Sequence, residues 1–359
     1  SAPAMTDAMA GNVDMVMESK GVVTAEGFTA EVAVPFKSLR YTAGGGKLWG
    51  VQVFRRIKRL NGEEDSWMPL SRSDTSILGQ AGHLTGFEGV SAERTLEIIP
   101  SLTLSETGKH VRTVTPAAVN ATPGLVDNGR FVNEPVKLDP GLTLKFGLTP
   151  TVTLDFAVNP DFAQVEADQL VVTTNQRFPI FFAEKRPFFL EGREIFETPL
   201  TALHTRAIVD PDAAGKLTGK LGRHSFGLLL ASDRGPGNFV GDERLNPKNF
   251  HYLDRNATAA VLRLKRDVGA DSHVGLVATS RSFKSDESPL TDFDLKSADP
   301  CLAEKSLERT NRVAGFDGHF RLDKITVFDF QLLATNSRGC FPDAVAGRDL
   351  YRVGNGLAY

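Results

Sequence analysis

The stretch GLTLKFGLTPTVTLDFAV, residues 141–158, alternates apolar and polar side chains on both sides of a tight turn. Residues 142–148 carry Leu or Phe at every second position, with Thr and Lys among the residues between. Residues 152–158 repeat the pattern with Thr and Asp opposite the apolar face. Successive side chains of a strand point to opposite faces, so this spacing predicts two antiparallel strands joined by a short turn.

The same alternation recurs along most of the chain and predicts an all-β fold. Further strands are expected at residues 96–104, 216–221, 225–232, 257–267, 272–282, 312–322 and 324–336. Short turns join them in pairs, and long polar segments separate the pairs, at residues 106–140, 160–213, 233–255, 283–310 and 338–350. This rhythm is typical of an outer-membrane β-barrel, whose turns are short on one side and whose loops are long on the other. A soluble antiparallel sheet is the alternative, although sandwiches usually space their strands more evenly.

Composition sets limits on the class of protein. The formal net charge of the 359-residue chain is −3, which gives no indication of nucleic-acid binding. No run of 18 apolar residues predicts a membrane helix, but barrel strands never show such a run. The chain has 2 Trp and 4 Tyr beside 24 Phe, which counts against the Trp- and Tyr-rich girdles of membrane barrels.

A second stretch, FPIFFAEKRPFFLEG at residues 178–192, combines aromatic clusters with adjacent charges. It falls in the long connection at residues 160–213, and its Phe content argues against disorder. We predict that this connection folds into a barrel lumen as a plug. Its aromatic side chains would pack together, while its charges pair with lumen-facing Lys145, Asp155, Lys216 and Lys220, because an unpaired buried charge is costly. The expected plug or lumen contacts are Phe181, Phe182, Glu184, Lys185, Arg186, Phe188 and Phe189. A hydrophobic extracellular subdomain with solvated charges is the alternative.

Three stretches resemble a family of bacterial envelope proteins: GFTAEVAVPFKSLRY, WGVQVFRR, and NPDFAQVEAD with the following NQRFPIFFAEKRPFFLEG. Members of this family join a family 9 carbohydrate-binding-like domain to the domain of unknown function 5916, which is thought to form an outer-membrane barrel. The resemblance implies an architecture and a location in the outer membrane of a Gram-negative bacterium, with the N-terminal domain in the periplasm. It implies no established reaction.

The resemblance and the strand pattern together predict the domain organisation. Residues 1–75 are expected to be the C-terminal part of a carbohydrate-binding-like β-sandwich, residues 76–93 a linker, and residues 94–359 an incomplete β-barrel domain. The first residues lack a basic segment followed by an apolar core, so they are not a signal peptide. Either the chain is mature or it begins inside a longer protein, and we expect the second because its first recognisable strand belongs to the middle of a domain rather than to its edge.

The candidate binding residues are few. Trp67 is the candidate for stacking on a sugar, whereas Trp49 lies in an alternating strand and is expected in a core. Asp161, Glu166 and Asp168 could supply oxygen ligands to calcium, but they lack the spacing of a calcium loop. Solvated or Arg-paired carboxylates are the default interpretation, so no metal and no cofactor is predicted.

Enzyme motifs are missing from the sequence. It contains no His-Glu-x-x-His motif, no nucleophile elbow and no phosphate-binding loop. We therefore predict a non-catalytic protein of envelope transport or glycan handling. Its partners would be outer-membrane lipid, with a glycan and other envelope proteins as further candidates, and no nucleic acid. A soluble or surface-attached carbohydrate-binding protein and a glycoside-active enzyme are the alternatives.

The two cysteines, Cys301 and Cys340, are expected in neighbouring long connections on the same side of the barrel. An oxidising extracellular face would allow them to form a disulfide if their Cα atoms lie within about 4.4–6.8 Å. Two free thiols are the alternative.

Overall fold

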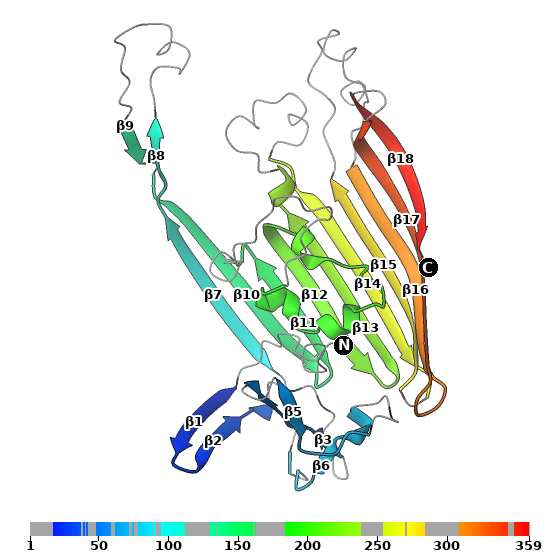
Figure 1. Ribbon diagram of the computed structural model, residues 1–359. Coiled ribbons are helices and arrows are strands. Elements are labelled where there is room, and N and C mark those ends of the chain that lie inside the picture. Colours follow the sequence, from blue (N-terminus) through cyan, green and yellow to red (C-terminus); the bar gives the residue numbers. More distant parts are fainter. Residues whose placement is uncertain are drawn as a thin grey trace, which may run out of the picture.

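The computed structural model describes most of the chain between residues 17 and 358 (Figure 1). The described part excludes residues 1–16, 37–38, 40, 42–47, 59–61, 72–73, 75–77, 88, 91–94, 112–129, 134, 161, 163–183, 238–253, 270, 284–308, 344–347 and 359.

A ten-stranded antiparallel sheet dominates the fold, and each of its strands pairs with the next one of the sheet along the chain, β7 pairing with β10 across an inserted hairpin. Its strands are β7 (Leu96–Ser105), β10 (Lys137–Thr149), β11 (Val152–Val158), β12 (Pro211–Leu221), β13 (His224–Asp233), β14 (Ala257–Asp267), β15 (His273–Phe283), β16 (Arg309–Arg321), β17 (Val327–Asp343) and β18 (Arg348–Ala358). The prediction of an all-β fold is confirmed, and so is the pairing of the two strands around residues 141–158. Among the described strands, β7 and β18 are the edges of the sheet.

The connections of the sheet alternate in length, as the sequence predicts. Short turns at residues 150–151, 222–223, 268–272 and 322–326 lie at one end of the sheet, which we call the turn end. Long connections leave the opposite end, the loop end, after β11, β13 and β15. The connection between β7 and β10 contains a hairpin of β8 (Gly108–Val111) and β9 (Arg130–Asn133). The last connection is shorter than predicted, because pairing of β17 with β18 continues to residues 343 and 348.

The two faces of the sheet differ in what they bury and expose: one buries charged side chains among apolar ones, and the other exposes large apolar side chains. On one face, Asp155, Lys216 and Arg263 are 4%, 2% and 0% exposed. On the other face, Phe156 and Leu230, in β11 and β13, are 42% and 51% exposed. We call the first the covered face and the second the open face. Charged side chains are almost never fully buried unless they are paired, so the covered face requires partners for these residues.

Residues 184–210, which we call the inner segment, lie over the covered face in front of β11–β14 (Figure 1). The inner segment contains α3 (Pro187–Leu190), α4 (Arg193–Phe196) and the 3₁₀ turn η4 (Thr205–Ala207). Its buried apolar side chains form a core with those of the strands below, namely Phe188, Phe189, Phe196, Ile208, Ala157, Ala214, Leu229, Ala231 and Val261. A second short 3₁₀ turn, η5 (Gly235–Gly237), follows β13.

A glycine of β13 lets α4 approach the sheet closely. A Cβ atom on Gly227 would lie 2.7 Å from Cζ of Phe196 and 3.1 Å from Cγ2 of Ile195. Real side chains do not tolerate the shorter distance, so the absence of a side chain at residue 227 makes room for the apolar face of α4.

The N-terminal region contains short two-stranded sheets that lie near the turn end (Figure 1). They pair β1 (Glu18–Thr24) with β2 (Gly27–Ala33), β3 (Trp49–Val51) with β6 (Gly82–Leu84), and β4 (Phe54–Ile57) with β5 (Glu63–Ser66), and a 3₁₀ turn, η3 (Leu78–Gln80), precedes β6. Arg321 of β16 forms ion pairs with Asp74 of this region and with Asp271 of the β14–β15 turn. The carbohydrate-binding-like sandwich and the domain boundaries stay predictions.

None of the helices in the described part of the chain is long and apolar enough to cross a membrane.

Candidate functional site: the inner segment and the charged face beneath it

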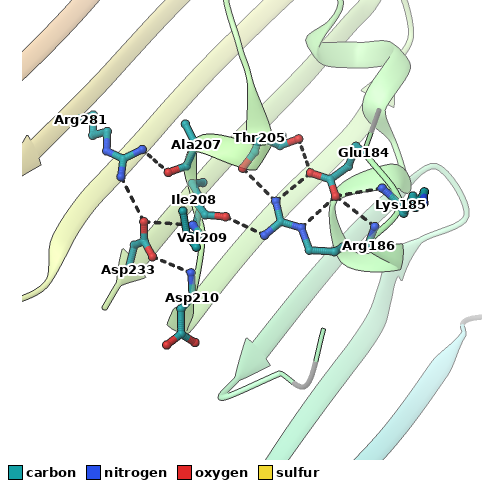
Figure 2. A network of polar contacts seen from close by, with 10 residues as sticks. All are labelled: Glu184, Lys185, Arg186, Thr205, Ala207, Ile208, Val209, Asp210, Asp233 and Arg281. Carbon is teal, nitrogen blue, oxygen red and sulfur yellow. Dashed lines mark hydrogen bonds and ion pairs between the residues drawn. The ribbon is translucent and has the colours of Figure 1, made fainter. Parts of the chain in front are cut away.

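A pair of opposite charges organises the start of the inner segment. Arg186 donates from Nε to Oε1 of Glu184 and from Nη2 to Oε2, both over 2.8 Å. The backbone N–H groups of Lys185 and Arg186 also donate to Oε1, and the Thr205 hydroxyl donates to Oε2 over 2.6 Å (Figure 2). Bidentate, charge-assisted hydrogen bonds of this kind are stronger than neutral ones and fix the geometry of both side chains.

The remaining donors of Arg186 close the segment on itself. Nη1 donates to the carbonyl of Ile208 over 2.6 Å, and Nη2 donates to the carbonyl of Thr205 over 3.0 Å (Figure 2). The guanidinium carbon lies 4.3 Å from the ring centre of Phe189 and 5.2 Å from that of Phe162. Arg186 is 0% exposed, so its charge is compensated by a carboxylate, carbonyl oxygens and aromatic faces rather than by water.

The protonation of Glu184 follows from the same contacts. Burial would raise its pKa, but the hydrogen bonds from Arg186 and Thr205 and the Arg186 charge outweigh that effect and lower the pKa to about 2. Glu184 is therefore ionised at neutral pH despite being 6% exposed.

Lys216 of β12 binds the backbone of the inner segment from below. Its Nζ donates to the carbonyl of Phe188 over 2.5 Å and to the carbonyl of Glu191 over 2.7 Å. The same Nζ lies 3.3 Å from Oδ2 of Asp155 in the adjacent strand β11. Since the carbonyls at the end of a helix have no partner within it, Lys216 satisfies groups at the end of α3 that burial would otherwise leave unpaired.

Asp233 and Arg281 hold the end of the inner segment (Figure 2). Asp233 accepts hydrogen bonds from the N–H groups of Val209 and Asp210, over 3.2 and 2.8 Å. Arg281 of β15 lies 3.2 Å from Oδ2 of Asp233 and donates to the carbonyl of Ala207. The carboxylate thus neutralises the arginine, and both groups bind main-chain atoms of the segment.

The middle of the inner segment is bound by Arg263 and Gln331. Arg263 of β14 forms a bidentate ion pair with Asp317 of β16 and donates to the carbonyl of Glu197 over 3.3 Å. Gln331 of β17 accepts from the N–H of Leu200 over 2.5 Å. Residues 197 and 200 are therefore anchored to strands on the far side of β13.

Together these contacts follow a single rule. Side chains of β12, β13, β14, β15 and β17 bind the main chain of the inner segment, at the residues Phe188, Glu191, Glu197, Leu200, Ala207, Val209 and Asp210. Recognition of main-chain atoms holds a segment in one position without requiring particular side chains on it. The described residues contain no group of His, Cys, Asp and Glu that could hold a metal ion.

The structure corrects the predicted partners of the charged residues Glu184 and Arg186. Glu184 and Arg186 pair with each other and not with Lys145, Asp155, Lys216 or Lys220. The reason is local. Glu184 and Arg186 are two positions apart in the chain that leads into α3, and side chains two positions apart in extended backbone lie on the same side, within reach of each other. Lys145 pairs instead with Glu191 over 2.8 Å, and Lys220 pairs with Asp267 over 2.6 Å. Lys185 is half-buried, and Phe188 and Phe189 are buried as predicted.

Several predicted residues lie outside the described part of the chain, namely Phe181, Phe182, Asp161, Glu166, Asp168 and Cys301. Cys340 lies within β17, opposite Tyr351, and not in the connection where the sequence placed it, because the ladder with β18 extends past residue 338. The disulfide with Cys301 stays a prediction.

The two tryptophans have different surroundings. Trp67 is 56% exposed, and its ring lies against Gly82, where a Cβ atom would meet it at 2.5 Å. Trp49 is half-buried and packs with the rings of Phe36, Tyr41 and Phe87. Trp67 therefore keeps the exposed face that stacking on a sugar requires.

Sequence reasoning did not single out Asp233, Arg263, Arg281, Asp317 or Gln331. Each of them stands at an inward position of a strand whose outward positions are mostly apolar. The alternation of the sequence predicts that these side chains point inward. It does not predict which main-chain atoms they bind.

Comparison with known families finds a match for part of the chain. Residues 126–206 match the domain of unknown function DUF5916. The match includes β10, β11 and the inner segment as far as η4, and hence the Glu184–Arg186 pair. The side chains of β12, β13, β14, β15 and β17 that bind the inner segment lie after the matched residues. No curated protein and no solved structure is detectably similar to the chain.

Proposed function

We propose that the chain forms part of an outer-membrane β-barrel with a carbohydrate-binding-like module at its periplasmic end, acting without catalysis in envelope transport or glycan handling. The observation that carries this proposal is that large apolar side chains are exposed along one face of the sheet while charged side chains are buried on the other. Leu264, Leu276 and Phe316 lie on the open face at 44%, 46% and 50% exposure, while charges and amides are buried on the covered face. Outward apolar and inward polar side chains are the pattern of strands that face lipid on one side and a polar interior on the other.

The lengths of the strands support the same proposal. Strands of the large sheet other than β11 contain 10 to 17 residues. A tilted strand needs about 9–11 residues to cross the hydrocarbon core of a bilayer. β11 has 7 residues and is the shortest strand of the sheet.

The ends of the sheet suggest an orientation. Membrane barrels carry short turns on the periplasmic side and long loops on the extracellular side. The turn end would then face the periplasm, and the N-terminal region, which lies near that end, would be periplasmic as well (Figure 1). In that region Trp67 is our candidate for contact with a glycan.

In this proposal the inner segment, within the connection at residues 160–213, is a plug. It would fill the interior of a barrel whose wall includes β7 and β10–β18, and further strands or a second copy would join the edges β7 and β18. No cofactor is proposed, and the partners are outer-membrane lipid, a glycan and other envelope proteins.

A matched pair of variants tests whether the open face contacts lipid. Leu276 and Ser280 lie on the same face of β15, Leu276 in the apolar part and Ser280 toward the loop end. In a bilayer, Leu276→Arg should cost about 2–4 kcal/mol and reduce the folded, detergent-extractable protein in the membrane fraction, while Ser280→Arg should cost about 0–1 kcal/mol. Recovery of folded wild-type monomer in a detergent-free soluble fraction, with both variants equally stable, would contradict the proposal.

A further inference from the structure

The open face of β15–β18 contains a groove with small side chains along its floor. Register places Ala278, Ala314 and Ala334 in one row across β15, β16 and β17. Toward the turn end the next row on the same face is Leu276, Phe316 and Leu332. The surface is hollowed between this row and the alanine row.

Toward the loop end the row beyond the alanines is polar. It consists of Ser280, Arg312, Asn336 and Asn355, again in register across β15–β18. The hollow between this polar row and the alanine row has a volume of about 770 Å³, within the range of about 300–1,000 Å³ that is typical of small-molecule sites. The groove is therefore apolar at one margin and polar at the other.

Arg312 is the positive charge of the polar row, and Arg338 stands in the next row toward the loop end on the same face. Arg312 is exposed, and none of the hydrogen bonds or ion pairs among the described residues involves its side chain. Asn336 donates to Asn355 over 2.7 Å beside it, and that bond leaves N–H donors on both amides free to bind a ligand. An arginine with no carboxylate partner, next to amides, suits the phosphate of an amphiphile.

We propose that this groove binds a phospholipid of net negative charge, whose headgroup carries no cation to compensate its phosphate, with the phosphate at Arg312 and an acyl chain across the alanine row toward Phe316. This inference rests on the proposed function, since only a membrane places lipid against the open face. The loop-end position of Arg312 then places the phosphate at the headgroup level of the leaflet on that side. The small alanine side chains provide the depth that a bound chain needs, and Leu276 and Leu332 flank it.

The test measures binding of phosphatidylglycerol to the full chain, purified in an uncharged maltoside detergent, by native mass spectrometry. Phosphatidylcholine with the same acyl chains and inorganic phosphate are the comparison ligands. We expect tighter binding of phosphatidylglycerol than of phosphatidylcholine, and Arg312→Ala should weaken it about fivefold, the effect of one basic residue at an anionic lipid surface. Arg266→Ala is the matched control, because Arg266 is an exposed arginine of the open face near the turn end.

A second variant tests the place of the acyl chain. Ala314→Phe should fill the groove and weaken binding of both lipids while leaving Arg312 in place. Its melting temperature in detergent should be unchanged, because residue 314 is exposed and the change keeps the open face apolar.

Three results would overturn the inference: equal binding of the two lipids, an Arg312→Ala variant that binds like the wild type, or full displacement of lipid by inorganic phosphate. These results leave the proposed function untouched in a protein that requires detergent. A chain that is folded and monomeric without detergent would instead refute the proposed function.

Discussion

Arg186 shows how one buried side chain can hold a segment together. It contacts a carboxylate, two carbonyl oxygens and two aromatic rings, which come from residues 162 to 208. Replacing both members of a buried ion pair by apolar residues is often harmless, but removing one member leaves an uncompensated charge. The stability of the inner segment therefore depends on keeping Glu184 and Arg186 together.

We expect Arg186→Ala to destabilise the inner segment by about 3–5 kcal/mol, because it strands the buried carboxylate of Glu184 and the carbonyl of Ile208. Limited proteolysis and thermal melting of the detergent-solubilised chain measure the change. Arg193→Ala is the matched control, since the Arg193 side chain is 50% exposed and lies 3.7 Å from Glu197, so it should change stability by under about 1 kcal/mol. Equal protease resistance of both variants would show that the pair is dispensable.

The pKa of Glu184 predicts an acid-sensitive segment. The folded pKa of about 2 lies below the ordinary value of 4.5, so ionisation stabilises the folded state at every pH above about 4.5. This contribution, up to about 3 kcal/mol, is lost as the pH falls from about 4.5 to 2. Protease sensitivity of the inner segment should rise over that range in the wild type. In Glu184→Gln it should be high already at neutral pH and nearly flat, and a wild-type profile without any change below pH 4.5 would contradict the assignment.

At the scale of elements, glycines decide how closely the inner segment and its anchoring side chains approach the strands. A Cβ atom on Gly275 of β15 would lie 2.6 Å from Nη1 of Arg263, so the guanidinium lies flat over this glycine on its way to Asp317. In the same way, the absence of a side chain at Gly227 leaves room for the ring of Phe196. The absence of side chains at these two positions thus permits both an ion pair and a helix contact.

Gly275→Ala should displace Arg263, weaken its ion pair with Asp317 and its contact with Glu197, and destabilise the chain by about 1–3 kcal/mol. Gly215→Ala is the control, because a Cβ atom there would meet its nearest neighbour, a ring carbon of Phe156, at an ordinary 3.8 Å. Thermal melting of both variants in detergent gives the comparison. A Gly275→Ala variant as stable as Gly215→Ala would show that Arg263 can reach Asp317 by another route.

At the scale of the whole molecule, the inner segment is held by the ten-stranded sheet, which contacts it through side chains on separate strands. Arg281 and Gln331, on β15 and β17, bind Ala207 and Leu200 and lie on opposite sides of β16. If the segment is a plug, as proposed, loss of these anchors should loosen it without removing its core, which rests on β11–β14.

We therefore expect the double variant Arg281→Ala, Gln331→Ala to raise ion conductance in planar bilayers several-fold over the wild type. Lys324→Ala is the control, because Lys324 lies exposed in the β16–β17 turn, away from the segment. Identical conductance of all three proteins would argue that the segment does not block a path, and a wild type that is already fully open would do the same.

The sequence by itself determined most strands of the large sheet, their faces and their order of pairing, but it did not predict β8, β9 or β18. In a meander each strand pairs with the next one along the chain, so local alternation and turn length are sufficient to predict the sheet. The alternation at residues 152–158 is one example, since it correctly separated Asp155 from Phe156. The burial of Phe188 and Phe189 was predictable for the same reason, because clustered aromatic residues seek a core.

Only the tertiary structure decided what the buried charges bind. The sequence suggested pairing of Glu184 and Arg186 with Lys216 and Asp155, whereas Arg186 binds Glu184 and Lys216 binds the carbonyls of Phe188 and Glu191. Every residue carries a carbonyl and nearly every residue an N–H group, so recognition of main-chain atoms leaves no signature in the amino-acid sequence. The choice among these equivalent groups is made by the path of the segment over the sheet, which depends on contacts between residues far apart in the chain.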